Sequence, residues 1–95
     1  MEVIPTPHEF VNGAPKEEID LHGMTVDEAI PRVDNFLYET FRSGYYRVWI
    51  IHGKGTGKLR QSVREMLSHH PHVKSYESGG EKEGGEGVTV AKLHA

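Results

Sequence analysis

The sequence predicts an α/β fold, a two-layer sandwich in which helices cover one four-stranded mixed sheet. Segments with strand and helix periodicity alternate along the chain in the order strand, helix, strand, helix, strand, strand. Helical crossovers make the first strands parallel, whereas the last two strands can form a hairpin. The length of 95 residues, 36% of them hydrophobic, fits one compact domain and leaves no room for a second.

Residues 1–16 are predicted to form an extended arm before a domain that spans residues 17–95. The arm holds three of the five prolines and shows no sustained apolar period, so it favours neither a helix nor a central strand. The domain begins with a short strand over residues 19–22, because Ile19 and Leu21 alternate with polar residues.

The first helix is predicted over residues 26–43. Thr25 and Glu28 have the spacing of a capping box, apolar side chains follow at steps of three and four residues, and Gly44 supplies a stop. Pro31 lies beyond the first turn and cannot donate to the carbonyl four residues earlier. We therefore expect a bend or a weakened first turn at this proline.

Residues 47–52 are predicted to form a strand that is buried on both sides. Val48 and Ile50 point to one face of the sheet, Trp49 and Ile51 point to the other, and all four side chains are apolar. Such a strand belongs in the interior of the sheet.

The second helix is predicted over residues 58–69, because apolar side chains recur at helical spacing until Pro71. Strands follow over residues 73–78 and 88–93, and the glycine- and glutamate-rich segment between them is expected to be a mobile connection outside the core. The helix dipole, rather than a metal site, accounts for the imidazoles near the end of this helix, those of His69, His70 and His72.

The segment HGKGTGK, residues 52–58, joins the second strand to the second helix and has features of a phosphate-binding turn. Its glycines let backbone amides approach an anion, and a helix N-terminus adds unpaired donors. It is not a Walker A loop, because His52 replaces the first glycine and Leu59 replaces the Ser or Thr that holds Mg²⁺. Nor is it a dinucleotide fingerprint, because Lys58 replaces the third glycine. A turn that needs glycines only for its geometry explains the segment equally well.

Local charge favours the phosphate interpretation. The formal net charge is -3, so the chain as a whole has no nucleic-acid-binding composition. Residues 47–64, however, contain no Asp or Glu and five cations, Arg47, Lys54, Lys58, Arg60 and Arg64. The solvated face of an ordinary helix explains Arg64 best and Lys54 worst. A polyanion on this loop would meet backbone amides and mobile cations together.

Asp20 and His22 form a second candidate site at the end of the first strand. Residues two apart on a strand share a face, so the carboxylate can fix the tautomer of the imidazole and raise its pKa, which suits proton transfer. A strand-terminal Asp and His often serve only to cap the next helix. Because the carboxyl ends of parallel strands share one edge of the sheet, His52 and the glycine loop are expected beside the pair.

Composition excludes several classes of protein. The absence of cysteine excludes disulfides and thiolate metal sites and suits a reducing cytoplasm. The sequence shows no signal-peptide pattern and no run near the ~20 apolar residues of a membrane span. We therefore expect a cytoplasmic protein that does not associate with membranes.

The motifs IDLHG and IIHGKGTGKLR, followed by HPHVKSY and GVTVAKL, resemble the small MutS-related (Smr) domain in their order. This family occurs at the C-terminus of the second bacterial MutS paralogue, in stand-alone bacterial proteins and in eukaryotic RNA-quality-control factors. The likeness spans residues 17–93. It implies a fold similar to the C-terminal domain of translation initiation factor 3, with both helices on one face of the sheet. Phe10 and Val11 of the arm would then cover the other face.

Because members of this family nick DNA or cleave RNA, the resemblance implies an endonuclease, with a role in mismatch repair, recombination control or ribosome rescue. Its Asp-x-His motif maps onto Asp20 and His22, and a basic residue important in RNA-cleaving members maps onto Arg60. With His52, these are the candidate catalytic residues. The glycine motif and nearby cations are the candidate nucleic-acid-binding residues, namely Gly53, Lys54, Gly55, Thr56, Gly57, Lys58 and Arg64.

Two functional hypotheses follow. In the first, the loop holds a phosphate while Asp20 orients His22 for cleavage. For RNA, the neighbouring 2′-OH attacks with His22 or His52 as base and no metal is needed; for DNA, water attacks and Mg²⁺ on Asp20 becomes plausible. No cluster of carboxylates lies near the loop in the sequence, which disfavours a two-metal site. In the second hypothesis, the same edge binds nucleic acid or a ribosome surface without cleavage.

Overall fold

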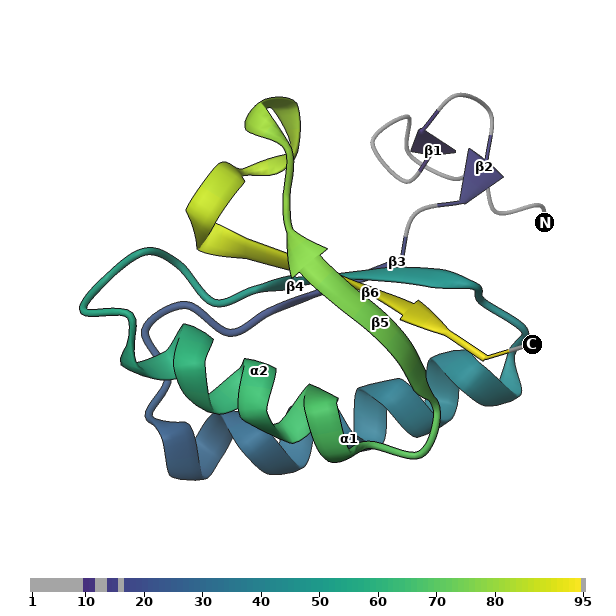
Figure 1. Cartoon of the computed structure of the whole chain (residues 1–95), viewed down its shortest axis with the longest axis horizontal. Coiled ribbons are helices and arrows are strands. Elements are labelled where there is room, and N and C mark those ends of the chain that lie inside the picture. Colours follow the sequence, from purple (N-terminus) through teal and green to yellow (C-terminus); the bar gives the residue numbers. More distant parts are fainter. Residues whose placement is uncertain (1–9, 12–13, 16, 95) are drawn as a thin grey trace, which may run out of the picture.

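The chain folds as the predicted α/β sandwich. A computed structural model describes residues 10–11, 14–15 and 17–94, and both helices lie on one side of its four-stranded sheet (Figure 1). The elements of this sandwich confirm the predicted bounds to within two residues. In chain order they are β3 (Glu17–Asp20), α1 (Val26–Arg42), β4 (Arg47–Ile51), α2 (Lys58–His69), β5 (Val73–Ser78) and β6 (Val88–Leu93).

The strands form a mixed sheet in the order β3-β4-β6-β5. β3 and β4 run parallel because α1 crosses between them, and β6 runs antiparallel to both of its neighbours, β4 and β5. In the parallel ladder Asp20 lies opposite Ile51, so β3 and β4 end side by side at one edge of the sheet. The turns that follow both strands therefore begin next to each other.

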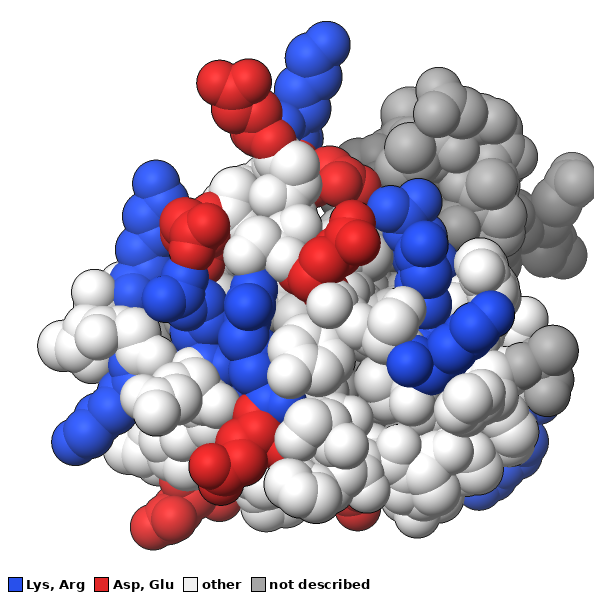
Figure 2. Space-filling model, viewed as in Figure 1, with Lys and Arg blue, Asp and Glu red and all other residues white. Residues whose placement is uncertain are grey.

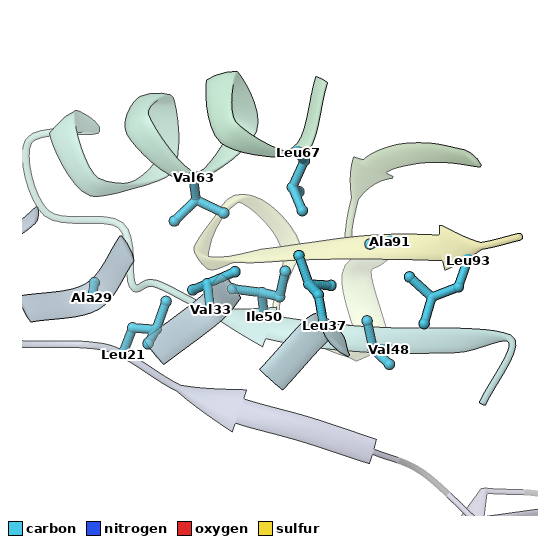
Figure 3. Packing of buried hydrophobic residues seen from close by; sticks show 10 residues of the cluster. All are labelled: Leu21, Ala29, Val33, Leu37, Val48, Ile50, Val63, Leu67, Ala91 and Leu93. Atoms are coloured by element: carbon cyan, nitrogen blue, oxygen red, sulfur yellow. The ribbon is translucent and has the colours of Figure 1, made fainter. Parts of the chain in front are cut away.

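The helix-facing side of the sheet carries the main core (Figure 3). Alternate residues of β4 and β6 meet the apolar stripes of α1 and α2 there. Complete burial of one such aliphatic side chain contributes ~1.5–3 kcal/mol, so this cluster fixes the strand ends relative to the helices. Its ten buried residues are Leu21, Ala29, Val33, Leu37, Val48, Ile50, Val63, Leu67, Ala91 and Leu93.

α1 begins with the predicted capping box. Oγ1 of Thr25 accepts a hydrogen bond from the amide of Glu28 (3.2 Å), and the carboxylate of Glu28 accepts one from the amide of Thr25 (2.9 Å). The helix continues past Pro31, whose ring is exposed, to Arg42. The proline therefore does not divide the helix.

The opposite face of the sheet carries a second, smaller cluster. Trp49, Val88 and Val90 are buried there with Ile51 beside them, which confirms that β4 is apolar on both faces. Nε1 of Trp49 donates a hydrogen bond to Oε2 of Glu83 (2.9 Å). The polar edge of the indole is thus bonded to the segment between β5 and β6.

That segment is folded, in place of the mobile connection that its composition predicted. It forms two 3₁₀ turns, Glu81–Glu83 and Gly85–Gly87. Gly84 between them has a φ of +102°, and a Cβ there would lie 2.5 Å from Cγ2 of Val88, so only glycine fits. Glutamates that look like solvated loop residues in the sequence, Glu83 and Glu86, have defined partners in the fold.

Four residues of the N-terminal arm are described. Phe10–Val11 (β1) and Ala14–Pro15 (β2) pair as a short antiparallel ladder. The predicted cover of the second sheet face by Phe10 and Val11 concerns side chains outside the described part of the chain.

The imidazoles at the end of α2 have separate packing roles. His70 is buried; its Nδ1 accepts from the amide of His72 (3.2 Å) and its Nε2 donates to Asp34 (3.1 Å). Burial lowers the pKa of His70. The ring of His72 stacks on Phe41 with the centroids 3.7 Å apart, and His69 donates to a carbonyl one turn back in α2.

Candidate nucleic-acid interface

The two candidate motifs meet where β3 and β4 end. The amide of Leu21 donates to the carbonyl of Ile51 (2.7 Å), which extends the ladder by one residue. A Cβ on Gly53 would lie 3.3 Å from Cβ of His22, and the φ of Gly53 is +79°. Both the backbone conformation and the close approach to His22 favour glycine at this position. The structure thus brings the Asp-x-His pair and the glycine loop together.

Asp20 and His22 form an exposed pair. Oδ1 of Asp20 accepts from Nδ1 of His22 (2.8 Å) and from the backbone amide of His22 (3.1 Å). Because β3 ends at Asp20, a turn rather than the strand itself brings the side chains together. Their hydrogen bond raises the pKa of His22 and lowers the pKa of Asp20. With Nδ1 donating to Asp20, Nε2 is the ring atom placed to exchange a proton.

His52 lies at the same edge of the sheet, but it is buried, with 4% of its surface exposed. Its Nδ1 donates to the carbonyl of Gly53 (2.9 Å), and its Nε2 accepts from the hydroxyl of Thr89 (2.8 Å). Burial lowers the pKa of His52, in agreement with a neutral ring in this arrangement. One ring nitrogen of His52 is bonded within its own loop and the other to β6, so the geometry favours a structural role for His52 over the predicted catalytic one.

The start of the glycine loop is closed by hydrogen bonds. The amides of His52 and Gly53 both donate to the carbonyl of Gly87, at 3.1 and 3.0 Å. The turn before β6 therefore fixes the position from which the rest of the loop extends. These two amides are not available to a ligand.

The second half of the loop and the first turn of α2 leave several of their donors open. Gly57 is the N-cap of α2 with a φ of +85° and has no side chain to cap the helix, although Oγ1 of Thr56 accepts from the amide of Lys58 (3.4 Å). Within the same part of the chain, the amides of Gly55, Thr56, Leu59 and Arg60 reach no acceptor. With no acidic residue in the first turn, this end of α2 is suited to an anion.

Three of the four residues with open amides, Gly55, Thr56 and Leu59, line a cleft of about 650 Å³ between the glycine loop and the start of α1. Its volume lies in the range of ordinary ligand sites. Asp20 and His22 stand outside the lining, next to Gly53, which belongs to it. The loop side of the cleft consists of predicted nucleic-acid-binding residues, Gly53, Lys54, Gly55, Thr56, Gly57 and Lys58.

Arg60 and Arg64 lie one turn apart on α2 and line a second, shallower groove. Nη1 of Arg60 donates to the carboxylate of Glu86. Nη2 of Arg64 donates to Oγ of Ser78 (2.6 Å), and its guanidinium lies 5.9 Å from the ring centroid of Tyr76. Arg64 is therefore anchored against β5, which argues against the alternative interpretation of this residue as part of a solvated helix face.

Figure 2 shows lysine and arginine side chains gathered over the turn before α2 and the front of that helix, with acidic side chains at their border. Among the described residues, no three His, Cys, Asp or Glu side chains lie close enough to hold a metal ion together. No helix in the described part of the chain is long and apolar enough to cross a membrane.

Sequence reasoning missed the groups that hold the site in place. They are the carbonyl of Gly87, the hydroxyls of Thr89 and Ser78, and the carboxylate of Glu86. All four come from β5, β6 or the connection between them, far from the loop in sequence, so no local spacing indicates them. The one available signal was the glycine-rich composition of that connection.

The fold and this edge of the sheet define a class of protein: a small α/β domain that presents a glycine loop with open amides beside a histidine–carboxylate pair. The chain belongs to the Smr domain family, whose family model matches residues 19–94.

Solved structures of related domains have the same fold. The Smr domain of Thermus thermophilus MutS2 matches with a TM-score of 0.81 and 44% identity, over 83% of this chain and 99% of that one. YdaL, a stand-alone small MutS-related protein from Escherichia coli, matches with a TM-score of 0.77 and 27% identity, over 82% of this chain and 64% of that one.

Curated relatives carry the name endonuclease MutS2. The protein from Symbiobacterium thermophilum is 57% identical over 76 residues, and that from Halalkalibacterium halodurans is 50% identical over 78 residues. These alignments include 80% and 82% of this chain but 10% of each relative. The chain thus spans about one tenth of the length of the relatives it matches.

Proposed function

We propose that this domain is a nicking endonuclease module, which holds a phosphate of DNA or RNA on the glycine loop and cleaves the phosphodiester bond with Asp20 and His22. The observation that carries the proposal is the close approach of His22 to Gly53, which puts a titratable imidazole beside a loop with open amides. Membership of the Smr family and similarity to proteins named endonuclease MutS2 support it.

The loop supplies the binding energy in this proposal. Its open amides are fixed donors, and Lys54 and Lys58 are exposed cations on either side of them. Arg60 follows on the first turn of α2, where its guanidinium can offset the negative charge that develops on the phosphorane. Such donors act most strongly in the transition state because they are already in place.

His22 supplies the proton transfers. Asp20 keeps Nδ1 protonated, so a neutral ring accepts a proton at Nε2 and a charged ring donates one from the same atom. With RNA, the neighbouring 2′-OH attacks the phosphorus and the 5′-oxygen leaves; with DNA, water is the nucleophile. We assign this role to His22 and not to His52, because both ring nitrogens of His52 are hydrogen-bonded inside the fold.

Mg²⁺ fits Asp20 as its one protein ligand. The ion is commonly held by one or two carboxylates together with phosphate oxygens of the substrate, and Oδ2 of Asp20 accepts no hydrogen bond from the described residues. When bound there, Mg²⁺ would polarise a phosphate oxygen. We propose this ion for a DNA substrate, where the attacking water needs activation.

A second candidate function is binding to nucleic acid or to a ribosome surface without cleavage. The observation that favours it is that neither Asp20 nor His22 lines the cleft formed by the open amides and lysines. Binding requires the loop and its cations, whereas cleavage also requires the pair. Variants of the pair therefore distinguish the two functions.

The deciding experiment incubates the pure domain with end-labelled single-stranded RNA, duplex DNA and branched DNA, each with Mg²⁺ and with EDTA. The nuclease proposal expects discrete cleavage products that disappear in the Asp20→Asn, His22→Ala double variant. Binding without products in every reaction would establish the second function. Products that persist at the wild-type rate in the double variant, prepared free of contaminating nuclease, would remove the pair from the mechanism.

The binding site is tested separately with the Lys54→Ala, Lys58→Ala double variant. Each phosphate contact contributes ~0.7 to 0.9 to the slope of log affinity against log salt. We expect weaker binding and a shallower salt dependence in fluorescence anisotropy titrations. An unchanged slope would show that the loop does not hold the phosphates.

A further inference from the structure

A second groove continues from the cleft along α2. It lies between α2 and the edge strand β5, and its walls include Gly57, Arg60, Arg64 and Ser78. Thr56 and Gly57 line both hollows, so a strand that crosses the glycine loop has a continuous path into this groove. The groove contains two arginines, whereas the cleft contains two lysines.

An anionic group of the protein already occupies the groove. The carboxylate of Glu86 accepts from the guanidinium of Arg60, and 65% and 36% of these two side chains are exposed. A guanidinium binds carboxylate and phosphate with the same forked set of donors. Glu86 therefore marks a place where a phosphate oxygen can lie, and an incoming phosphate displaces it from Arg60.

Arg64 has donors to spare in the same groove. A guanidinium carries five N–H donors, and among the described residues Ser78 is the one hydrogen-bond acceptor that Arg64 reaches. Arg60 and Arg64 are four residues apart, or about 6 Å along the helix. That distance suits successive phosphates of one strand.

β5 adds an aromatic ring beside Arg64, that of Tyr76, which does not itself line the groove. Tyr76 pairs with Ala91 in the sheet, so its side chain lies on the helix side, next to Arg64. Although it is large and aromatic, 36% of its surface is exposed. Its ring centroid lies 5.9 Å from Cζ of Arg64, which is within the reach of a single nucleotide. A base can stack on such a ring when it is unpaired.

We propose that this groove is a second nucleotide subsite, which binds the next phosphate of a single strand on Arg60 and Arg64 and stacks a neighbouring base on Tyr76. The inference rests on the proposed function, because it continues the strand whose first phosphate lies on the glycine loop. It assigns an unpaired stretch of nucleic acid, in a single strand or beside the duplex part of a branched substrate, as the preferred ligand over a fully paired duplex.

The stacking part is tested with Tyr76→Leu and its matched control Tyr76→Phe, which keeps an aromatic face. Affinity for a labelled ten-nucleotide single strand and for the same sequence as a duplex is measured by fluorescence anisotropy. We expect Tyr76→Leu to weaken single-strand binding between about fivefold and a hundredfold, the range of base–aromatic stacking. Tyr76→Phe should bind like the wild type, and duplex binding should be unchanged in both variants.

The phosphate part is tested with Glu86→Gln and its matched control Glu81→Gln. Both variants lose one negative charge in the same connection, but Glu81 is exposed and contacts no cation among the described residues. Removing the competitor of the phosphate should tighten single-strand binding about two- to fivefold, the scale of an exposed ion pair. Glu81→Gln should give a clearly smaller gain.

Substitutions of Arg64 provide a third test. We expect Arg64→Gln to weaken single-strand binding and Arg64→Lys to retain part of the affinity that Arg64→Gln loses. Thermal unfolding verifies that each variant folds. Equal loss of single-strand and duplex binding in Tyr76→Leu, no loss at all, or equal gains in the two glutamate variants would overturn the subsite. If one of these outcomes is found while the Lys54→Ala, Lys58→Ala double variant still binds more weakly than the wild type, the result overturns the groove alone and leaves the proposed function in place.

Discussion

Two strand-to-helix turns lie side by side in this domain. The backbone amides of one are capped by side chains, whereas several amides of the other have no acceptor. The turn after β3 leads into α1, where Thr25 and Glu28 satisfy each other's amides in a complete capping box. The turn after β4 leads into α2 through Gly57, which has no side chain to offer, and the amides of Leu59 and Arg60 stay open. One helix end is closed by its own sequence, whereas the other keeps open donors.

The charges differ in the same sense. The first turn of α1 holds Asp27 and Glu28, which the positive end of the helix dipole stabilises. The first turn of α2 holds Lys58 and Arg60 instead, which that dipole repels. The second arrangement is unfavourable for the folded domain alone and becomes favourable once an anion is bound. In the proposed function, stability and binding therefore depend on different turns of the same sheet edge.

The titratable pair lies at the turn after β3, so the proposed function also separates proton transfer from phosphate binding. Asp20 and His22 are exposed and hydrogen-bonded to each other, while the loop after β4 provides amides and cations. Four predictions test this division, from the largest expected effect to the smallest.

The largest effect is expected from His22→Ala. If the imidazole transfers protons in the transition state, the cleavage rate falls by ~10² to 10⁴ while affinity stays nearly constant, because the ring adds little to ground-state binding. Rates are measured under single-turnover conditions and affinity by anisotropy. Asp20→Asn should have a similar effect, because it removes the charge that orients the ring. A parallel loss of affinity in His22→Ala would contradict the separation.

Lys58→Glu should move stability and binding in opposite directions. An acidic residue at the start of α2 gains ~0.3–1 kcal/mol from the helix dipole, so the free energy of unfolding should rise. The same residue repels phosphate from the open amides, so affinity should fall about tenfold or more at low salt. Urea unfolding and anisotropy measure the two effects, and Lys58→Gln separates the loss of a positive charge from the gain of a negative one. A decrease in both the free energy of unfolding and the affinity would show that the dipole of α2 is not destabilised by the cations in its first turn.

Thr25→Ala should affect stability alone. Loss of an N-cap side chain costs ~1 kcal/mol, which lowers the melting temperature of a domain of this size by about 4–8 °C. Thr25 lines the α1 wall of the cleft, but its Oγ1 bonds within its own capping box, so nucleic-acid affinity should change little. Differential scanning calorimetry and anisotropy measure the two quantities. A clear loss of affinity would mean that the closed turn also contributes to binding.

Most of the difference between the two turns can be predicted from the sequence. The distant groups that bond to residues of these turns cannot. Capping-box spacing, helical periodicity and the glycine repeat are local signals, and they placed the helices and both turns correctly. The burial of His52 depends on Thr89, which becomes its neighbour only through the pairing of β4 with β6. The pairing of Arg60 with Glu86 likewise depends on how the connection before β6 folds. Contacts of this kind follow from the sheet topology and have no signature in either local segment.

The smallest effect concerns the two histidines of the turns, which should titrate on opposite sides of their ordinary pKa of 6.5. The hydrogen bond and charge of Asp20 raise the pKa of His22, and burial lowers the pKa of His52. Protonated His22 therefore increases the free energy of unfolding below pH 6.5, and this contribution is lost as pH rises through the raised pKa of His22. Neutral His52 increases the free energy of unfolding above pH 6.5, and this contribution is lost as pH falls through the lowered pKa of His52.

Titration of the ring protons by NMR gives both values directly. We expect the resonances of His22 to shift above pH 6.5 and those of His52 below it, with Asp20→Asn moving His22 back toward 6.5 and leaving His52 unchanged. Thr89→Val, which removes the hydroxyl next to Nε2, should perturb His52 alone. If Asp20→Asn moved both rings, the two turns would be electrostatically coupled, and the assignment of chemistry to one turn and phosphate binding to the other would not hold.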